Sequence, residues 1–115
     1  MTDAEKLTTI KTLLSDGGEM PSDDKLNTYI ALSKAEILAW KYHLVGGVPE
    51  SITDVTPTDE VAQIYAVVAG YTHAGAESER RHSENSVVRD FIYGDMIDYI
   101  RDHVLPYVRV GSLKN

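Results

Sequence analysis

The sequence of 115 residues contains no cysteine. Without cysteine, neither a disulfide framework nor a thiolate zinc site can form. No run of about 18 apolar residues is present, so we expect no membrane-spanning helix. Residues 1–11 lack the basic start and apolar run of a signal peptide. Walker loops, dinucleotide-binding glycine patterns, internal repeats and low-complexity tracts are absent too. We therefore expect a soluble protein of a reducing compartment that holds no cofactor.

Basic residues are also few. Lys and Arg number 11 against 18 Asp and Glu, which gives a net charge of −7. Proteins that read DNA or RNA usually carry a basic stripe that neutralises phosphates, and here only Arg80 and Arg81 are adjacent. The charge balance argues against a sequence-reading nucleic-acid binder. The remaining composition, 43% hydrophobic and 25% charged, is ordinary globular usage and predicts a single domain with a modest core.

Apolar residues at helical spacing predict two helices in the first half of the chain. The first spans residues 1–15, begins with the capping-box pair Thr2 and Glu5, and ends at residues 16–18. The second begins at the N-cap Ser22 and runs to about residue 44. The predicted core stripe of the first helix is Leu7, Ile10, Leu13 and Leu14, and that of the second is Leu26, Tyr29, Ile30, Ser33, Ile37, Trp40 and Leu44.

The second half predicts two more helices separated by a polar and extended excursion. Pro57 opens the third helix, which has small residues on further faces and should be the central helix of a bundle. Residues 86–93 alternate in character and predict an extended segment, which Gly94 ends. A last helix follows over residues 96–105 and stops at Pro106. The predicted stripe of the third helix is Val61, Ile64, Tyr65, Val68 and Tyr71, and that of the last helix is Met96, Ile97, Ile100, Val104 and Leu105.

These elements predict an all-α fold: a small bundle of about four helices with a long polar loop and extended segment between the third and the last. Residues 1–106 form the helical domain, and residues 107–115 form a C-terminal tail. The tail carries apolar side chains without enough chain around them to bury them. A segment of this kind often docks on another protein, by side-chain contacts or by strand addition.

The polar stretch, residues 75–86, holds most residue types that carry chemistry. His82, Ser83, Glu84 and Asn85 are adjacent, so they point in different directions and cannot form a catalytic triad among themselves. We therefore expect no enzyme. A small metal-dependent hydrolase is a rival hypothesis, and it predicts a metal ion held by His73, Glu77 and His82.

Charges of both signs in and after the polar stretch favour a protein–protein contact. Asn, Ser and His side chains satisfy backbone groups in turns, so residues 82–85 can hold a rigid exposed loop. If copies of the chain stand side by side, the basic set of one can face the acidic set of the next, in a head-to-tail interface that closes into a ring. The basic set is Arg80, Arg81 and Arg89, and the acidic set is Glu77, Glu79, Glu84 and Asp90.

The same stretch resembles the signature of the head–tail connector (adaptor) proteins of long-tailed phages and prophages. That family tends to show Gly-Ala-Glu-Gly, a short polar spacer, Ser-His-Ser-Glu-Asn-Gly, then Ser-Arg and an aromatic residue. The matching residues here are Gly75-Ala76-Glu77, His82-Ser83-Glu84-Asn85, Arg89 and Phe91. The layout of helices is similar over nearly the whole chain. Departures from the family pattern, which put the path of the loop in question, are Ser78, Arg81, Ser86 and Val88.

The resemblance implies a structural virion protein, assembled in the bacterial cytoplasm and located at the head–tail junction. It implies a dodecameric ring on the portal of the DNA-filled capsid, which extends the DNA tunnel and receives the head-closure and tail proteins. DNA would pass through without specific binding. We expect the subunit interface at Glu77, Arg80, Arg81, His82, Ser83, Glu84, Asn85, Arg89 and Asp90, and the portal contact at Tyr107, Val108, Arg109, Val110 and Leu113. The alternative function is a small bacterial helical interaction or regulatory domain.

Overall fold

Four helices make up most of the chain in the computed structural model. They are α1 (Asp3–Leu14), α2 (Asp23–Tyr42), α3 (Pro57–Arg81) and α4 (Asn85–His103). The structure describes residues 1–15, 20–81 and 85–108, and within residues 73–81 and 85–91 it describes the backbone alone. No strand occurs among the described residues. The predicted all-α class is confirmed.

Local signals fix the start of the first three helices where the sequence predicts them. The Thr2 hydroxyl accepts a hydrogen bond from the Glu5 N–H at 3.1 Å, and the Glu5 carboxylate accepts one from the Thr2 N–H at 2.8 Å. This reciprocal pair satisfies two N–H groups that have no partner inside the helix. The Ser22 hydroxyl caps α2 by accepting from the Lys25 N–H at 3.3 Å. Pro57 is the first residue of α3, where its missing N–H costs nothing.

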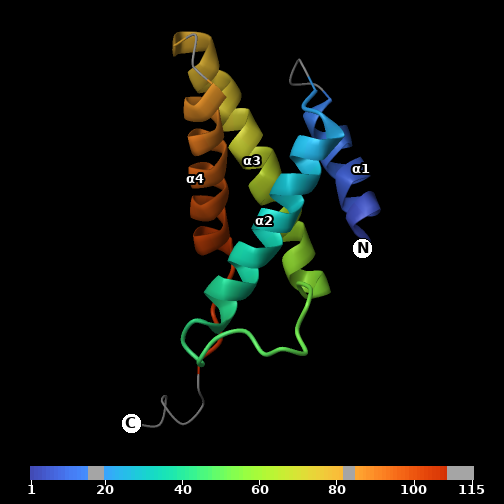
Figure 1. Cartoon of the computed structure of the whole chain (residues 1–115), viewed down its shortest axis with the longest axis vertical. Coiled ribbons are helices and arrows are strands. Elements are labelled where there is room, and N and C mark those ends of the chain that lie inside the picture. Colours follow the sequence, from blue (N-terminus) through green and yellow to red (C-terminus); the bar gives the residue numbers. More distant parts are fainter. Residues whose placement is uncertain (16–19, 82–84, 109–115) are drawn as a thin grey trace.

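The helices form two crossing pairs (Figure 1). α3 and α4 run antiparallel as a hairpin, and α2 crosses both. α1 packs against α2 and α3 and, among the residues that the structure describes, makes no contact with α4. α3 packs against each of the other three helices, which confirms its predicted central position. The connected ends of α3 and α4 extend past the ends of α1 and α2, so this part of the hairpin stands clear of the other two helices (Figure 1).

The core differs from the predicted stripes at several positions. Val61 and Tyr65 of α3 are 59% and 43% exposed, and Leu13, Leu44 and Leu105 of the other predicted stripes are exposed as well. α3 itself carries apolar or small residues on more than one face, so their spacing alone does not show which face the bundle covers. The buried set is Ile10, Leu26, Tyr29, Ile30, Ile37, Val55, Ile64, Ala66, Val67, Ile92, Met96, Ile100 and Val104.

The predicted extended segment over residues 86–93 is wrong, because α4 runs through it and through Gly94 without a break. Ile92, Met96 and Ile100 recur every four residues and are all buried, so packing on the bundle outweighs the strand preference of the β-branched residues before them. Gly94 is exposed and costs only its low helix propensity. The predicted long loop is wrong as well: residues 75–81 belong to α3, residues 85–86 belong to α4, and residues 82–84 lie outside the described residues.

The α3–α4 hairpin is closely packed at Gly70. A Cβ atom added there would stand 2.6 Å from the Ile92 carbonyl oxygen and 3.2 Å from Ile92 Cγ2. Contacts this short show that the backbones approach more closely than any larger residue permits. Gly70 therefore sets the separation of the two helices that carry the polar stretch.

Candidate functional site

The hairpin brings the two halves of the polar stretch to one end of the molecule. The last turns of α3 carry the first half, and the first turns of α4 carry the second (Figure 1). Of the predicted subunit-interface residues, Glu77, Arg80 and Arg81 belong to α3, Asn85, Arg89 and Asp90 belong to α4, and His82, Ser83 and Glu84 lie outside the described residues. Because the side chains of this region are not described, their contact with a neighbouring subunit stays a prediction.

The start of the predicted portal contact is fastened to the bundle. Tyr107 donates its N–H to the Lys41 carbonyl at 2.8 Å, and its ring meets that of Tyr42 edge-on at 5.1 Å. Tyr107 and Val108 still expose 42% and 45% of their surface. Tyr107 therefore contributes to the packing of its own chain, which the sequence did not indicate. The remaining predicted residues, Arg109, Val110 and Leu113, lie outside the described residues.

A nearly buried ion pair supports that attachment. Lys41 Nζ lies 2.6 Å from Asp59 Oδ2 and 4.5 Å from the centre of the Tyr107 ring. Burial acts to lower the Lys41 pKa, but the bonds to Asp59 and Tyr107 outweigh it, so the pKa is raised and the amine stays charged. One side chain of α2 thus joins the first turn of α3 to the segment that follows α4.

A groove of about 300 Å³ lies between α2 and α4. Trp40 forms one side of it and donates its indole N–H to the Val104 carbonyl at 2.7 Å. His43 stacks on the indole at 4.7 Å, and the Arg101 guanidinium lies 5.5 Å from the indole centre. The lining residues are Glu36, Ala39, Trp40, His43, Ile97, Ile100 and Arg101.

The chemistry of this groove suits binding better than catalysis. The Glu36 carboxylate accepts a hydrogen bond from the Tyr93 hydroxyl at 2.5 Å, and His43 Nδ1 lies 2.6 Å from the Trp40 carbonyl oxygen. The Glu36 carboxylate and the His43 imidazole therefore already have polar partners within the chain. No Ser, Thr, Cys or Lys that could act as a nucleophile is among the lining residues. The helical spacing of Trp40 favours a core position, and the sequence alone did not indicate this groove.

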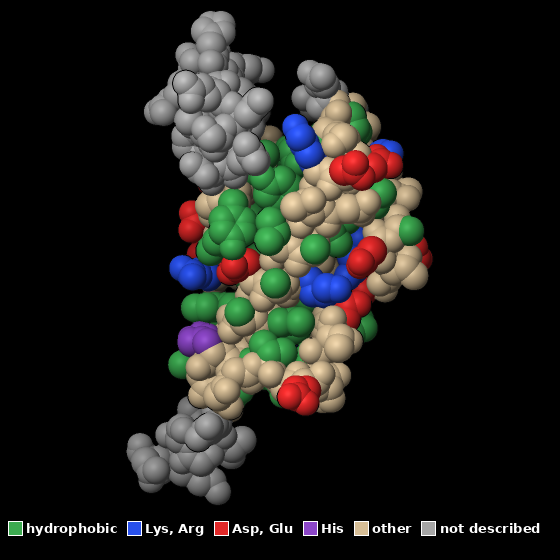
Figure 2. Space-filling model, viewed as in Figure 1, with side chains coloured by type: hydrophobic (Ala, Val, Ile, Leu, Met, Phe, Trp, Pro, Cys, Tyr) green, Lys and Arg blue, Asp and Glu red, His purple; other side chains and the backbone are tan. Residues whose placement is uncertain are grey.

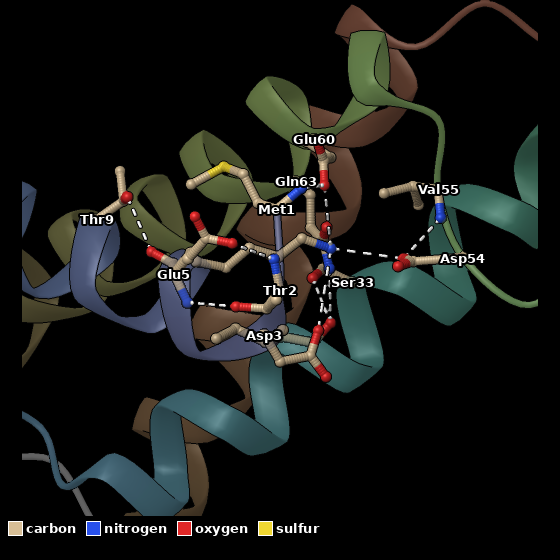
Figure 3. A network of polar contacts seen from close by, with 12 residues as sticks. Met1, Thr2, Asp3, Glu5, Thr9, Ser33, Asp54, Val55, Glu60 and Gln63 are labelled. Carbon is tan, nitrogen blue, oxygen red and sulfur yellow. Dashed lines mark hydrogen bonds and ion pairs between the residues drawn. The ribbon is translucent and has the colours of Figure 1, made fainter.

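A second polar cluster surrounds Lys6, whose side chain is completely buried. Figure 3 labels the acidic residues of this cluster, Asp3, Asp54 and Glu60. Lys6 Nζ lies 3.5 Å from Asp54 Oδ1, 3.9 Å from Glu60 Oε2 and 4.0 Å from Asp3 Oδ1. The Met1 amine lies 2.7 Å from Glu60 Oε2. These contacts join α1 to the connection before α3 and to the first turn of α3.

The Lys6 cluster is best explained as a structural fastening. Its carboxylates offset the charge of the buried ammonium, and breaking such a group is costly. Beside it, Gln63 Nε2 donates to the Ile30 carbonyl at 2.9 Å, while Gln63 Oε1 is buried and without a partner in the described part of the chain. Sequence reasoning missed Lys6, although it stands four residues before Ile10 and therefore shares its helix face.

Metal binding and membrane insertion find no support among the described residues. No three His, Cys, Asp or Glu side chains in that part of the chain are grouped so that they could hold a metal ion. The side chains of the hypothetical ligands His73, Glu77 and His82 fall outside it. No helix, over the residues searched, is long and apolar enough to cross a bilayer.

Comparison with known proteins finds no matching family model, no similar curated protein and no similar solved structure. The evidence for the fold class is therefore the structure alone. The resemblance to phage connector proteins is based on the residues of the polar stretch and on the order of helices along the sequence.

Proposed function

We propose that the chain is a structural virion protein that forms a ring adaptor between the portal of a DNA-filled capsid and the head-closure and tail proteins. The observation that carries the proposal is the set of matching residues in the polar stretch, Gly75-Ala76-Glu77, His82-Ser83-Glu84-Asn85 and Arg89. The protein performs no reaction. It extends the DNA tunnel and supplies surfaces to its neighbours.

The hairpin geometry agrees with a subunit contact at the polar stretch. Both halves lie on the part of α3 and α4 that stands clear of α1 and α2, where another molecule has room to approach (Figure 1). Arginines and carboxylates occur in both halves, so a neighbouring copy offers charges of the opposite sign to each. Such a contact repeats around a ring because each copy donates one surface and receives the other.

The charge distribution agrees with a tunnel through which DNA moves. Every phosphate that Lys or Arg neutralises strengthens binding, and a strongly basic wall would hold the duplex. The chain carries a net charge of −7, and the Lys and Arg side chains visible in Figure 2 are scattered among Asp and Glu. We expect the purified protein to show no salt-sensitive binding of duplex DNA.

Co-assembly with the portal tests the proposal. The chain is mixed with the portal protein encoded in the same genome, and the complex is measured by mass photometry and electron microscopy. A ring on the portal supports the proposal. A stable dimer without affinity for the portal favours the alternative, a small bacterial interaction or regulatory domain. The position of the gene, directly after those for portal and major capsid protein, is an independent test.

Variants test the proposed interface and tail. Replacing Arg89 or Glu84 by alanine should weaken ring assembly and leave the helix content unchanged, because the proposed charge pairs form between copies and not within one. Loss of the fold in these variants would make the two residues structural. A chain truncated after Pro106 should fail to join the portal, and one that still joins it would refute the tail assignment.

A further inference from the structure

Leu105 is a preorganised apolar anchor. It exposes 85% of its surface, the largest fraction among the large hydrophobic residues that the structure describes. The backbone is pinned on both sides of it: the Val104 carbonyl accepts from the Trp40 indole at 2.7 Å, and the Tyr107 N–H donates to the Lys41 carbonyl at 2.8 Å. A backbone that is already ordered has little conformational entropy left to lose on binding. The backbone at Leu105 therefore already has the conformation in which it would present the side chain to a partner.

The groove between α2 and α4 has the size and surface to receive such an anchor. Ile97, Ile100 and Ala39 give it apolar walls beside the Trp40 indole. Its volume of about 300 Å³ is at the lower limit of small-molecule sites. The groove therefore suits an aliphatic side chain better than an extended ligand.

Two charges beside these features are also complementary. Arg101 on the groove is exposed, and in the described part of the chain its guanidinium has the Trp40 ring for a contact but no carboxylate. Asp102, three residues before Leu105, is exposed and lies in the last turn of α4, where the negative helix end disfavours a carboxylate. Adjacent residues of a helix do not face each other, so these two charges cannot pair within one chain.

We propose that the α2–α4 groove of one copy binds Leu105 of a second copy, and that Arg101 of the first pairs with Asp102 of the second. Each chain carries both the anchor and the groove, which is the arrangement that lets identical subunits associate repeatedly. The inference rests on the proposed function in one respect, since it supplies the ring with a further subunit contact. That contact lies at the end of α4 opposite to the polar stretch (Figure 1).

Self-association of variants tests the apolar part. Native mass spectrometry and sedimentation velocity follow wild type, Leu105→Asp and the matched control Leu13→Asp over a concentration series. Leu13 is also an exposed leucine, 40% accessible, but it lies on α1, which does not contact α4. Leu105→Asp should weaken association at least about tenfold, the size typical of a central anchor, and Leu13→Asp should leave it unchanged. Circular dichroism checks that both variants keep their helices.

A charge exchange tests the partner. R101D places two acids at the contact and D102R places two bases, so each variant alone should associate less than wild type. Mixed in equal amounts, they should recover association as alternating copies, because the acidic groove of one meets the basic anchor of the other. Recovery in the mixture is expected only if the two residues meet between chains.

The outcomes separate this inference from the proposed function. If wild type is monomeric when alone, the same variants are compared as rings bound to portal. A Leu105→Asp chain that associates as wild type does, or an R101D and D102R mixture that recovers nothing, overturns the groove contact and leaves the adaptor proposal standing. A wild-type chain that neither self-associates nor joins a portal overturns both.

Discussion

Two helical glycines should respond to alanine in opposite directions. Gly70 lies in α3 against α4, where an added Cβ would come within 2.6 Å of the Ile92 carbonyl oxygen. Gly94 lies in α4, and an added Cβ there would have no heavy atom within 4 Å. Both substitutions gain the same helix propensity, about 1 kcal/mol. Any difference between them therefore measures the packing of α3 against α4.

The expected magnitudes follow from these contacts. At Gly70 the obstructing atom belongs to the backbone, so α4 has to shift, and forcing an extra methyl into a packed core costs about 1–3 kcal/mol. With the gain in propensity of about 1 kcal/mol subtracted, the net destabilisation of G70A should be up to about 2 kcal/mol. G94A should be stabilised by about 0.5–1 kcal/mol, since nothing opposes the gain.

Urea unfolding, monitored by circular dichroism, measures both free energies on the same chain. The two variants should differ by about 2 kcal/mol, or about 8 °C in melting temperature. G70A with at least the stability of wild type would refute the close approach of the helices at residue 70. A destabilised G94A would contradict a continuous α4 at residue 94. It would favour instead the break at Gly94 that the sequence alone had predicted.

Three further substitutions probe polar groups in the core and at its edge. Asp59→Ala should cost about 3 kcal/mol because it leaves the nearly buried Lys41 ammonium unpaired, and urea unfolding should show a smaller loss when Lys41→Met is added. Burial acts to raise the Asp54 pKa, but the Val55 N–H and nearby charges lower it below the ordinary 3.8, so its contribution to stability is present above pH 3.8 and lost as the pH falls further. Asp54→Asn should therefore reduce the loss of stability on acidification in unfolding curves at pH 7 and pH 3, and an unchanged acid response would contradict this. Tyr71→Phe should be neutral or stabilising by up to about 1 kcal/mol, because the buried hydroxyl has no partner among the described residues. A loss larger than 1 kcal/mol in that variant would reveal a hydrogen bond that the described residues do not supply.

The sequence predicts the starts of the first three helices well because those signals are local. The hydroxyls of Thr2 and Ser22 bond to N–H groups three residues on, so nothing distant has to be known. The prediction for residues 86–93 failed because the contacts that decide their conformation are distant in the sequence. Their strand preference is real, but burial of Ile92 and Met96 against α3 decides the conformation, and a single stretch does not contain that information.

The surface features were harder to foresee for the same reason. Val61 and Tyr65 have the spacing of a core face, and only the packing around α3 shows which face is covered. The groove at Trp40 depends on two helices that are distant in the sequence, and the hydrogen bond from its indole to the Val104 carbonyl joins residues 64 positions apart. By contrast, the resemblance of the polar stretch to the connector signature can be read from the sequence alone. The structure adds that the two halves of this stretch lie at the same end of the α3–α4 hairpin.

The most direct test of the adaptor proposal is the mass of the complex that the chain forms with its portal. We expect a discrete species in which a ring of copies, dodecameric by the family resemblance, is added to the portal ring, with a central channel visible by electron microscopy. Portal protein that keeps its own mass in the presence of excess chain would contradict the proposal.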